Sequence, residues 1–233
     1  MNKIYRSIWN VTLGTWVAAP ETAHASGVRA QAVLGLAFAC TVGGPANAAA
    51  LLYWDINGNT AGLGGTGTWD TSSAFWNTSS TGTGGTVSAW TNGNVDSATL
   101  AGTAGTVTLG VPITAGNVTF TTTGYTLTGS TLTLGGVTPT ITSNAGISAT
   151  VSSVIAGSAG LTKAGAGTLT LNGANTFSGG VNVTTGILNV NGNAALGAAS
   201  NGIVMANGTQ LGSAGALAAT RVVTLTGGNV TLS

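Results

Sequence analysis

Three aspartates are the side chains beyond residue 50 whose type and spacing come closest to suggesting chemistry. Asp55, Asp70 and Asp96 lie 15 and 26 residues apart. These intervals are near the coil length of a stacked β-structure, so two carboxylates could face one another as an acid and a base. Such pairs usually have basic or aromatic subsites in a cleft, and the basic residues of this part, Lys163 and Arg221, lie far along the chain. We therefore expect no catalytic residues.

Nucleophilic and metal chemistry have even less support in this part of the sequence. Beyond residue 50 there is no His, Cys or Glu, which excludes Ser-His-Asp and Cys-His triads and any His-based zinc site. Residues 55–59 resemble the start of a calcium loop, but they hold one carboxylate and no closing Glu follows. We interpret them as a turn held by Asx hydrogen bonds, and we expect no metal site and no cofactor.

The tryptophans beyond residue 50 gather within residues 51–95. One interpretation is a cap, because the end of a stacked β-structure exposes an open core and an unpaired strand that bulky rings can cover. The other is a candidate glycan platform, in which indole faces bind a sugar and an Asp accepts from its hydroxyls. Nothing in the spacing defines a sugar-binding geometry, so the sequence favours the cap. The four residues are Trp54, Trp69, Trp76 and Trp90.

Composition points to an ordered β-protein with few charges. Of 233 residues, 39 are glycine and only 4% are charged, yet 43% are hydrophobic and Val, Ile and Leu recur in alternation, which favours a folded β-array over disorder. From residue 51 onward, Lys163 and Arg221 stand against three aspartates, a net charge of −1. Such a surface would not bind phosphate, so we expect no nucleic-acid partner.

Short segments of alternating apolar and polar residues, separated by Gly and Asn turns, predict β-strands. Their spacing suits an antiparallel β-sandwich as well as a solenoid. Recurring Asn and Thr favour the solenoid, because a parallel β-helix stacks like residues over like. We predict an all-β, right-handed parallel β-helix, with the antiparallel β-sandwich as the alternative. The expected strands are 106–109, 117–120, 125–128, 131–134, 138–142, 147–154, 168–171, 181–184, 187–190, 222–225 and 229–232.

The clearest repeat lies at residues 160–197, GLTKAGAGTLTLNGANTFSGGVNVTTGILNVNGNAALG. It closely resembles the autotransporter-associated β-strand repeat, also called the passenger-associated transport repeat. The resemblance implies a secreted parallel β-helix passenger in which the repeat is linked to export. We interpret its lysine as a solvated edge charge that discourages strand addition. The matching positions are Gly160, Leu161, Lys163, Gly165, Gly167, Leu169, Leu171, Gly173, Asn175, Gly179, Gly180, Gly186 and Leu188.

Residues 1–50 resemble the extended signal peptide region of large exported Gram-negative proteins. A second apolar run, Ala32–Val42, has the length of a signal h-region and is too short to span a bilayer. It contains Cys40, so the mature chain would lack cysteine and disulfides. The residues that carry the signal resemblance are Met1, Asn2, Lys3, Ile4, Tyr5, Arg6, Trp9, Asn10, Trp16 and Val17, and the expected cleavage region is Ala46, Ala48 and Ala50.

These features predict three parts: an extended signal peptide at 1–50, a Trp-rich cap at 51–95 and parallel β-helix repeats at 96–233. We expect the N-terminal part of an exported autotransporter passenger, a β-helical stalk or adhesin-like surface protein without catalysis. The alternative is a carbohydrate-binding or polysaccharide-modifying β-helix that uses the N-terminal Trp and Asp cluster.

The resemblance also implies partners and a location. The expected partners are the inner-membrane export machinery, an outer-membrane β-barrel translocator and a host or cell-surface glycan or protein. Nothing after Gly197 resembles barrel strands, so we expect the front of a longer passenger or a truncated gene. Joined to a barrel, the protein would be secreted or lie at the cell surface or outer membrane; otherwise it would be periplasmic.

Overall fold

The computed structural model describes residues 5–10, 15–20 and 49–233. The chain divides into two units, Met1–Gly44 and Pro45–Ser233. In the first unit, β1 (Tyr5–Asn10) and β2 (Thr15–Pro20) pair as an antiparallel ladder. The predicted apolar run of the signal peptide and several of its predicted residues lie outside the described residues: Met1, Asn2, Lys3, Ile4, Ala46 and Ala48.

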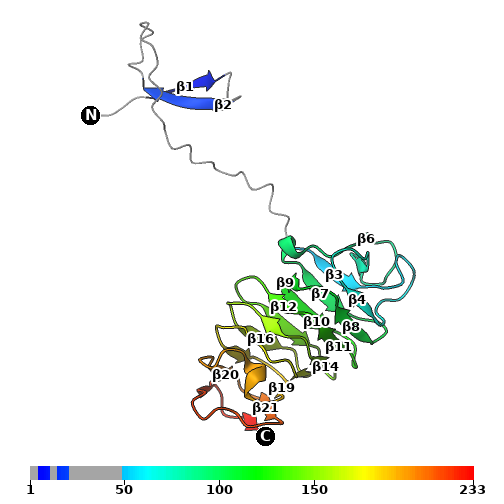
Figure 1. Cartoon of the computed structure of the whole chain (residues 1–233), viewed down its shortest axis with the longest axis vertical. Coiled ribbons are helices and arrows are strands. Elements are labelled where there is room, and N and C mark those ends of the chain that lie inside the picture. The colour runs from blue at the N-terminus through cyan, green and yellow to red at the C-terminus, as the bar shows by residue number, and fades with distance from the viewer. Residues whose placement is uncertain (1–4, 11–14, 21–48) are drawn as a thin grey trace. The chain divides into compact units, whose positions relative to one another are not determined.

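The second unit is a parallel β-solenoid built from three sheets, and its coils follow one another from β3 to β23 (Figure 1). The ten-stranded first sheet contains β3 (Leu51–Trp54), β5 (Trp76–Asn77), β6 (Val87–Ser88), β7 (Ser97–Leu100), β10 (Asn117–Phe120), β13 (Thr140–Ser143), β16 (Leu161–Ala164), β18 (Val181–Val183), β20 (Ile203–Met205) and β22 (Val223–Leu225).

The other two sheets complete the coils. The eight-stranded second sheet contains β4 (Gly67–Trp69), β8 (Thr106–Leu109), β11 (Thr126–Gly129), β14 (Ser148–Val151), β17 (Thr168–Leu171), β19 (Ile187–Val190), β21 (Gln210–Ser213) and β23 (Thr231–Leu232). The three-stranded third sheet contains β9 (Ile113–Ala115), β12 (Leu132–Leu134) and β15 (Ile155–Ala156), and two short 3-10 helices are η1 (Asn92–Asn94) and η2 (Asn193–Leu196).

The direction of strand pairing distinguishes the two predicted folds. All pairs among β7 to β23 are parallel. In residues 49–233 the antiparallel pairs are those of β5 with β3 and with β6. The predicted parallel β-helix is confirmed. The antiparallel β-sandwich is wrong because from β7 onward each strand pairs in parallel with strands of the neighbouring coils, and successive strands of a coil belong to different sheets.

The core follows from alternation within each strand and from register between coils. In β17, Leu169 and Leu171 are buried while the threonines between and before them are partly exposed. Register then places like side chains over like, so that one interior column of the second sheet consists of Val107, Leu127, Val151, Leu171 and Val190. A single coil buries too few side chains to offset its ordering entropy, so the core exists only where coils stack.

Coil length is nearly constant, and the corners set where strands end. Val118 lies 20 residues after its partner Ala98, and Ile141 lies 23 residues after Val118. The single strand predicted over 147–154 is wrong, because the backbone amides of Ser152 and Ser153 both donate to Leu127 O, at 2.7 and 3.3 Å. These two bonds close a corner between β14 and β15.

Replacing Leu169 with Ala should lower the free energy of unfolding by about 2–5 kcal/mol, because it removes a fully buried side chain and leaves a cavity. Replacing the adjacent Thr170, which points outward from the same strand, should change it by about 0.5 kcal/mol or less. Urea unfolding followed by circular dichroism measures both values. Equal losses for the two variants would contradict the inward and outward assignment.

Candidate functional site

The repeat predicted at 160–197 forms two consecutive coils. We call residues 161–180, which contain β16 and β17, the repeat coil, and residues 181–202, which contain β18 and β19, the following coil. The two are in register, with Leu161 opposite Val181 and Leu169 opposite Leu188. The repeat's leucines are buried in the interior: Leu161, Leu169, Leu171 and Leu188.

Glycines of the repeat occupy corners where the backbone has no room for a side chain. Gly165 has a φ of +75°, and a Cβ there would collide with Ser143 O in the coil below. Gly186 has a φ of +73°, and its Cβ would lie 2.5 Å from the carbonyl oxygens of Gly165 and Gly167. Both glycines are therefore needed for a left-handed turn and for close stacking. Gly160, Gly179 and Gly180 also have positive φ, and Gly167 and Gly173 closely approach backbone oxygens of the preceding coil.

Asn175 joins the repeat coil to both of its neighbours. Its side chain is buried; Oδ1 accepts from the amide of Ile155 at 2.8 Å and Nδ2 donates to Ala195 O at 2.6 Å. Asn201 acts similarly one coil later, because its Nδ2 donates to Phe177 O at 2.9 Å and its Oδ1 accepts from the amide of Gly180 at 3.2 Å. The side-chain amides of both residues thus form hydrogen bonds with backbone N–H and C=O groups that would otherwise need a strand as their partner.

The interpretation of Lys163 as a solvated edge charge is wrong. The residue is 0% exposed. On β16 it lies between Ile141 of β13 and Val183 of β18, in an interior column that is otherwise apolar. The signal was present in the alternation, because Lys163 stands two residues after the buried Leu161 and two residues in a strand return to the same face.

Backbone carbonyls hold the buried ammonium. Lys163 Nζ donates to Ala164 O at 2.9 Å and Gly165 O at 2.6 Å in its own coil, and to Thr185 O at 3.0 Å in the following coil. Burial lowers the pKa of Lys163 from 10.5 to about 8, because the charged form has lost water. At neutral pH the side chain is still protonated and all three of its donors have acceptors.

The other basic side chain of residues 49–233 is also used internally. Arg221 is 7% exposed; its Nε donates to Asn193 Oδ1 at 2.8 Å and its Nη1 donates to Asn201 O at 2.7 Å. Burial lowers the pKa of this guanidinium from its usual value. The side chains of Lys163 and Arg221 are therefore not exposed to bind an anionic ligand. Sequence reasoning missed this arrangement for Arg221, and no local pattern marks it.

The three aspartates do not form a catalytic pair. Asp55 is buried and accepts from Asn77 Nδ2 at 2.8 Å, and Asp96 is buried and accepts from the amide of Ala50 at 2.7 Å. Asp70 is partly exposed and caps its own turn, accepting from the amides of the two serines at 72 and 73 at 2.8 and 2.6 Å. These hydrogen bonds lower the pKa of Asp70, with the amide of Ser73 contributing most.

The four tryptophans form a buried cluster inside the first coil. None is more than 1% exposed, and the rings of Trp69, Trp76 and Trp90 contact one another with centroids 4.5–4.8 Å apart, while Trp54 lies 5.4 Å from Trp76. A glycan platform needs an exposed ring face, so that interpretation is wrong for these residues. The four rings are part of the hydrophobic core instead.

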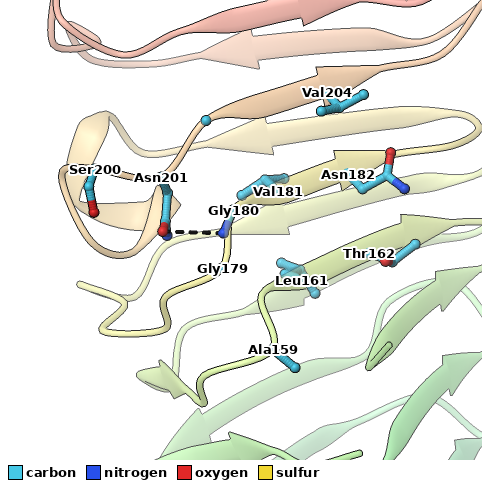
Figure 2. Close-up of a pocket in the computed structure, with 11 residues that line it drawn as sticks. Ala159, Leu161, Thr162, Gly179, Gly180, Val181, Asn182, Ser200, Asn201 and Val204 are labelled. Carbon is cyan, nitrogen blue, oxygen red and sulfur yellow. Dashed lines mark hydrogen bonds between the residues drawn. The ribbon is translucent and has the colours of Figure 1, made fainter. Parts of the chain in front are cut away.

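A shallow hollow of about 370 Å³ lies beside the repeat coil (Figure 2). Thr162, Asn182 and Val204, which face one another along β16, β18 and β20, line one side of it, and Gly180 and Asn201 line the corner. No ionisable side chain lines it. The Asn201 amide that borders it is already bonded to the backbone of Gly180 and Phe177, so the hollow has no group free for acid–base work.

The described residues, 5–10, 15–20 and 49–233, also bear on metal binding and on membrane insertion. Among these residues, no cluster of three or more His, Cys, Asp or Glu side chains is placed to hold a metal ion. None of the helices described there is long and apolar enough to cross a membrane. What the geometry defines in residues 49–233 is a structural β-solenoid whose cations are internal.

Two family models match the chain. The extended signal peptide of type V secretion systems matches residues 1–50, and the passenger-associated transport repeat matches residues 161–190. The adhesin BmaC autotransporter of Brucella suis biovar 1 (strain 1330) is 54% identical over 214 residues, which cover 92% of this chain and 6% of that protein. The chain thus spans a small part of the length of this curated relative. No solved structure matches it.

Together the two family models and the relative support an autotransporter passenger with an extended signal peptide and a passenger-associated transport repeat. They also support an exported protein at the cell surface or outer membrane.

Replacing Trp76 with Ala should lower the free energy of unfolding by about 3–5 kcal/mol, because the ring is fully buried against three aromatic neighbours. Trp76→Phe keeps most of the contact area and should lose less. Chemical unfolding followed by circular dichroism gives both values. A change below about 0.5 kcal/mol for Trp76→Ala, as expected at an exposed ring, would restore the platform interpretation.

Because the Lys163 ammonium is buried, we predict that the free energy of unfolding rises with pH. Between pH 8 and 10.5 the unfolded chain holds a proton on Lys163 that the folded chain has released, so the free energy of unfolding increases across this window. From pH 7 to 9.5 the wild type should gain about 2 kcal/mol, whereas Lys163→Met should gain none from this position. Urea titrations at the two pH values measure the difference. The same gain in both proteins would rule out Lys163 as its source.

Proposed function

We propose that this chain is the N-terminal part of an exported autotransporter passenger that serves as a β-helical stalk or adhesin-like surface segment. The observation that carries the proposal is an uninterrupted stack of coils whose ionisable groups are almost all internal. In residues 49–233, Asp55, Asp96, Lys163 and Arg221 are buried, and Asp70 is the one charged side chain that is partly exposed. A surface of this kind supports a mechanical or adhesive role.

The proposal includes the absence of catalysis. The carboxylates cap turns, the tryptophans are buried, and the hollow beside the repeat coil lacks ionisable groups. The alternative of a carbohydrate-binding or polysaccharide-modifying β-helix required the Trp and Asp cluster to be open to a ligand, and no observation favours it. Residues 51–95 act as the cap in this proposal, and residues 96–233 as the stalk.

We further propose that the repeat assists secretion by folding outside the cell. Each added coil buries apolar side chains and completes backbone ladders, so folding beyond the outer membrane would oppose backward movement of the chain. The partners are then the inner-membrane export machinery and the outer-membrane translocator. As an adhesin-like segment, the stalk would present a surface to host or cell-surface glycans or proteins.

Removing the repeat coil alone should reduce export, because it removes most of the segment that matches the transport repeat, residues 161–190. Deletion of residues 161–180 preserves register, since Val181 lies opposite Leu161 and replaces it directly. Introduced in frame into the chromosomal gene, the deletion should lower the surface signal of intact cells in immunolabelling several-fold.

A matched deletion serves as the control. Removing residues 118–140 also removes one coil in register, because Ile141 lies opposite Val118, and it leaves the repeat intact. This variant should be exported at close to the wild-type level. If both deletions reduce surface exposure equally, the effect belongs to solenoid length and the special role of the repeat is refuted.

A further inference from the structure

Burial of the Lys163 ammonium depends on the following coil, which must stack on the repeat coil to exclude water from it. Lys163 is fully buried, and in the strand register it lies between Ile141 of the coil below and Val183 of the coil above. Two of its three acceptors belong to the repeat coil, and the third, Thr185 O, belongs to the following coil. The backbone reinforces this junction, because Thr184 donates to Lys163 O through both its amide, at 2.9 Å, and its hydroxyl, at 3.0 Å.

Opening the following coil would return this ammonium to water. The interior above the repeat coil is covered by Val181 and Val183, so their departure opens the column in which Lys163 lies. Water then replaces Thr185 O, and the desolvation penalty of the buried charge disappears. An apolar side chain in the same place would lose burial on opening instead. The lysine therefore favours the opened state relative to any apolar residue in its column.

No other charge offsets this effect. Lys163 is the only ionisable side chain from Thr126 to Thr220, so β13, β14, β17, β18 and β19 bring no carboxylate to it. An inward-pointing charge is also a known means of protecting an exposed sheet edge from pairing with other chains. When the following coil is open, Lys163 places such a charge at the exposed end of the core.

We propose that Lys163 is a built-in opening point, at which the following coil separates from the repeat coil and leaves a soluble, charged end on the solenoid. In the opened state, the end of the core then holds a protonated amine rather than only apolar side chains. The same junction closes fully once the next coil stacks. This inference concerns the purified protein and does not depend on the proposed export role.

Hydrogen exchange on the purified chain at pH 7, read by mass spectrometry, tests the inference. In Lys163→Met, amides of residues 181–190 should exchange at least ten-fold more slowly than in wild type. Leu161→Met is the matched control, because it changes a buried neighbour on the same strand without altering charge, and its exchange should match wild type within about three-fold. Unchanged or faster exchange in folded Lys163→Met would overturn the proposal.

A second measurement needs no variant and so does not depend on whether Lys163→Met folds. Raising the pH from 7 to 8.5 neutralises most of the closed-state amine, whose pKa is about 8, while the opened state stays charged. After correction for intrinsic rates, opening of residues 181–190 in wild type should become about four-fold rarer. Residues 107–127, distant from Lys163 in the chain, should show no such change. A flat response in residues 181–190 would also refute the opening point.

Discussion

Stacking of each coil on the next is the interaction on which the structure depends. A coil of about twenty residues contributes a few inward side chains, such as Leu169 and Leu171, and cannot form a core by itself. In-register parallel ladders supply the missing surface and pair the backbone of each strand with its neighbours. Corner glycines and the buried amide of Asn175 follow from the same constraint, because coils this close leave little space and leave backbone groups that need partners.

The same constraint explains where the chain places its few charges. The hollow beside the repeat coil has no ionisable side chain in its lining. The charged groups of residues 49–233 instead form hydrogen bonds that hold turns and corners. Asp96 ties the start of β3 to the turn before β7, while Arg221 ties the last coils together. The outer face is left with hydroxyl and amide groups in rows, for example Thr126, Thr150 and Thr170.

Much of the fold could be predicted from the sequence because period-two alternation is local. The strands at 117–120, 168–171 and 187–190 have the predicted bounds, and the parallel stacking suggested by recurring Asn and Thr is confirmed. The corner at Ser153 was not predictable, since its apolar flanks continue the alternation and the turn depends on Leu127 of another coil. The charge of Lys163 predicts an exposed side chain, whereas its position two residues after the buried Leu161 predicts an inward one. The position is the signal that agrees with the structure. Asp55 can be buried because Asn77 donates a hydrogen bond to its carboxylate. No pattern in the sequence indicates that these two residues meet.

The interior position of Lys163 depends on the register in which the repeat coil and the following coil stack. A different register would expose its ammonium. Acylation of amines by an N-hydroxysuccinimide ester, read by mass spectrometry on the native protein at pH 7.5, tests the interior position most directly. We expect Lys163 to be modified far more slowly than the α-amino group in the folded protein and to react readily once urea unfolds the chain. Rapid modification of Lys163 in the folded protein would contradict the register and the buried ammonium together.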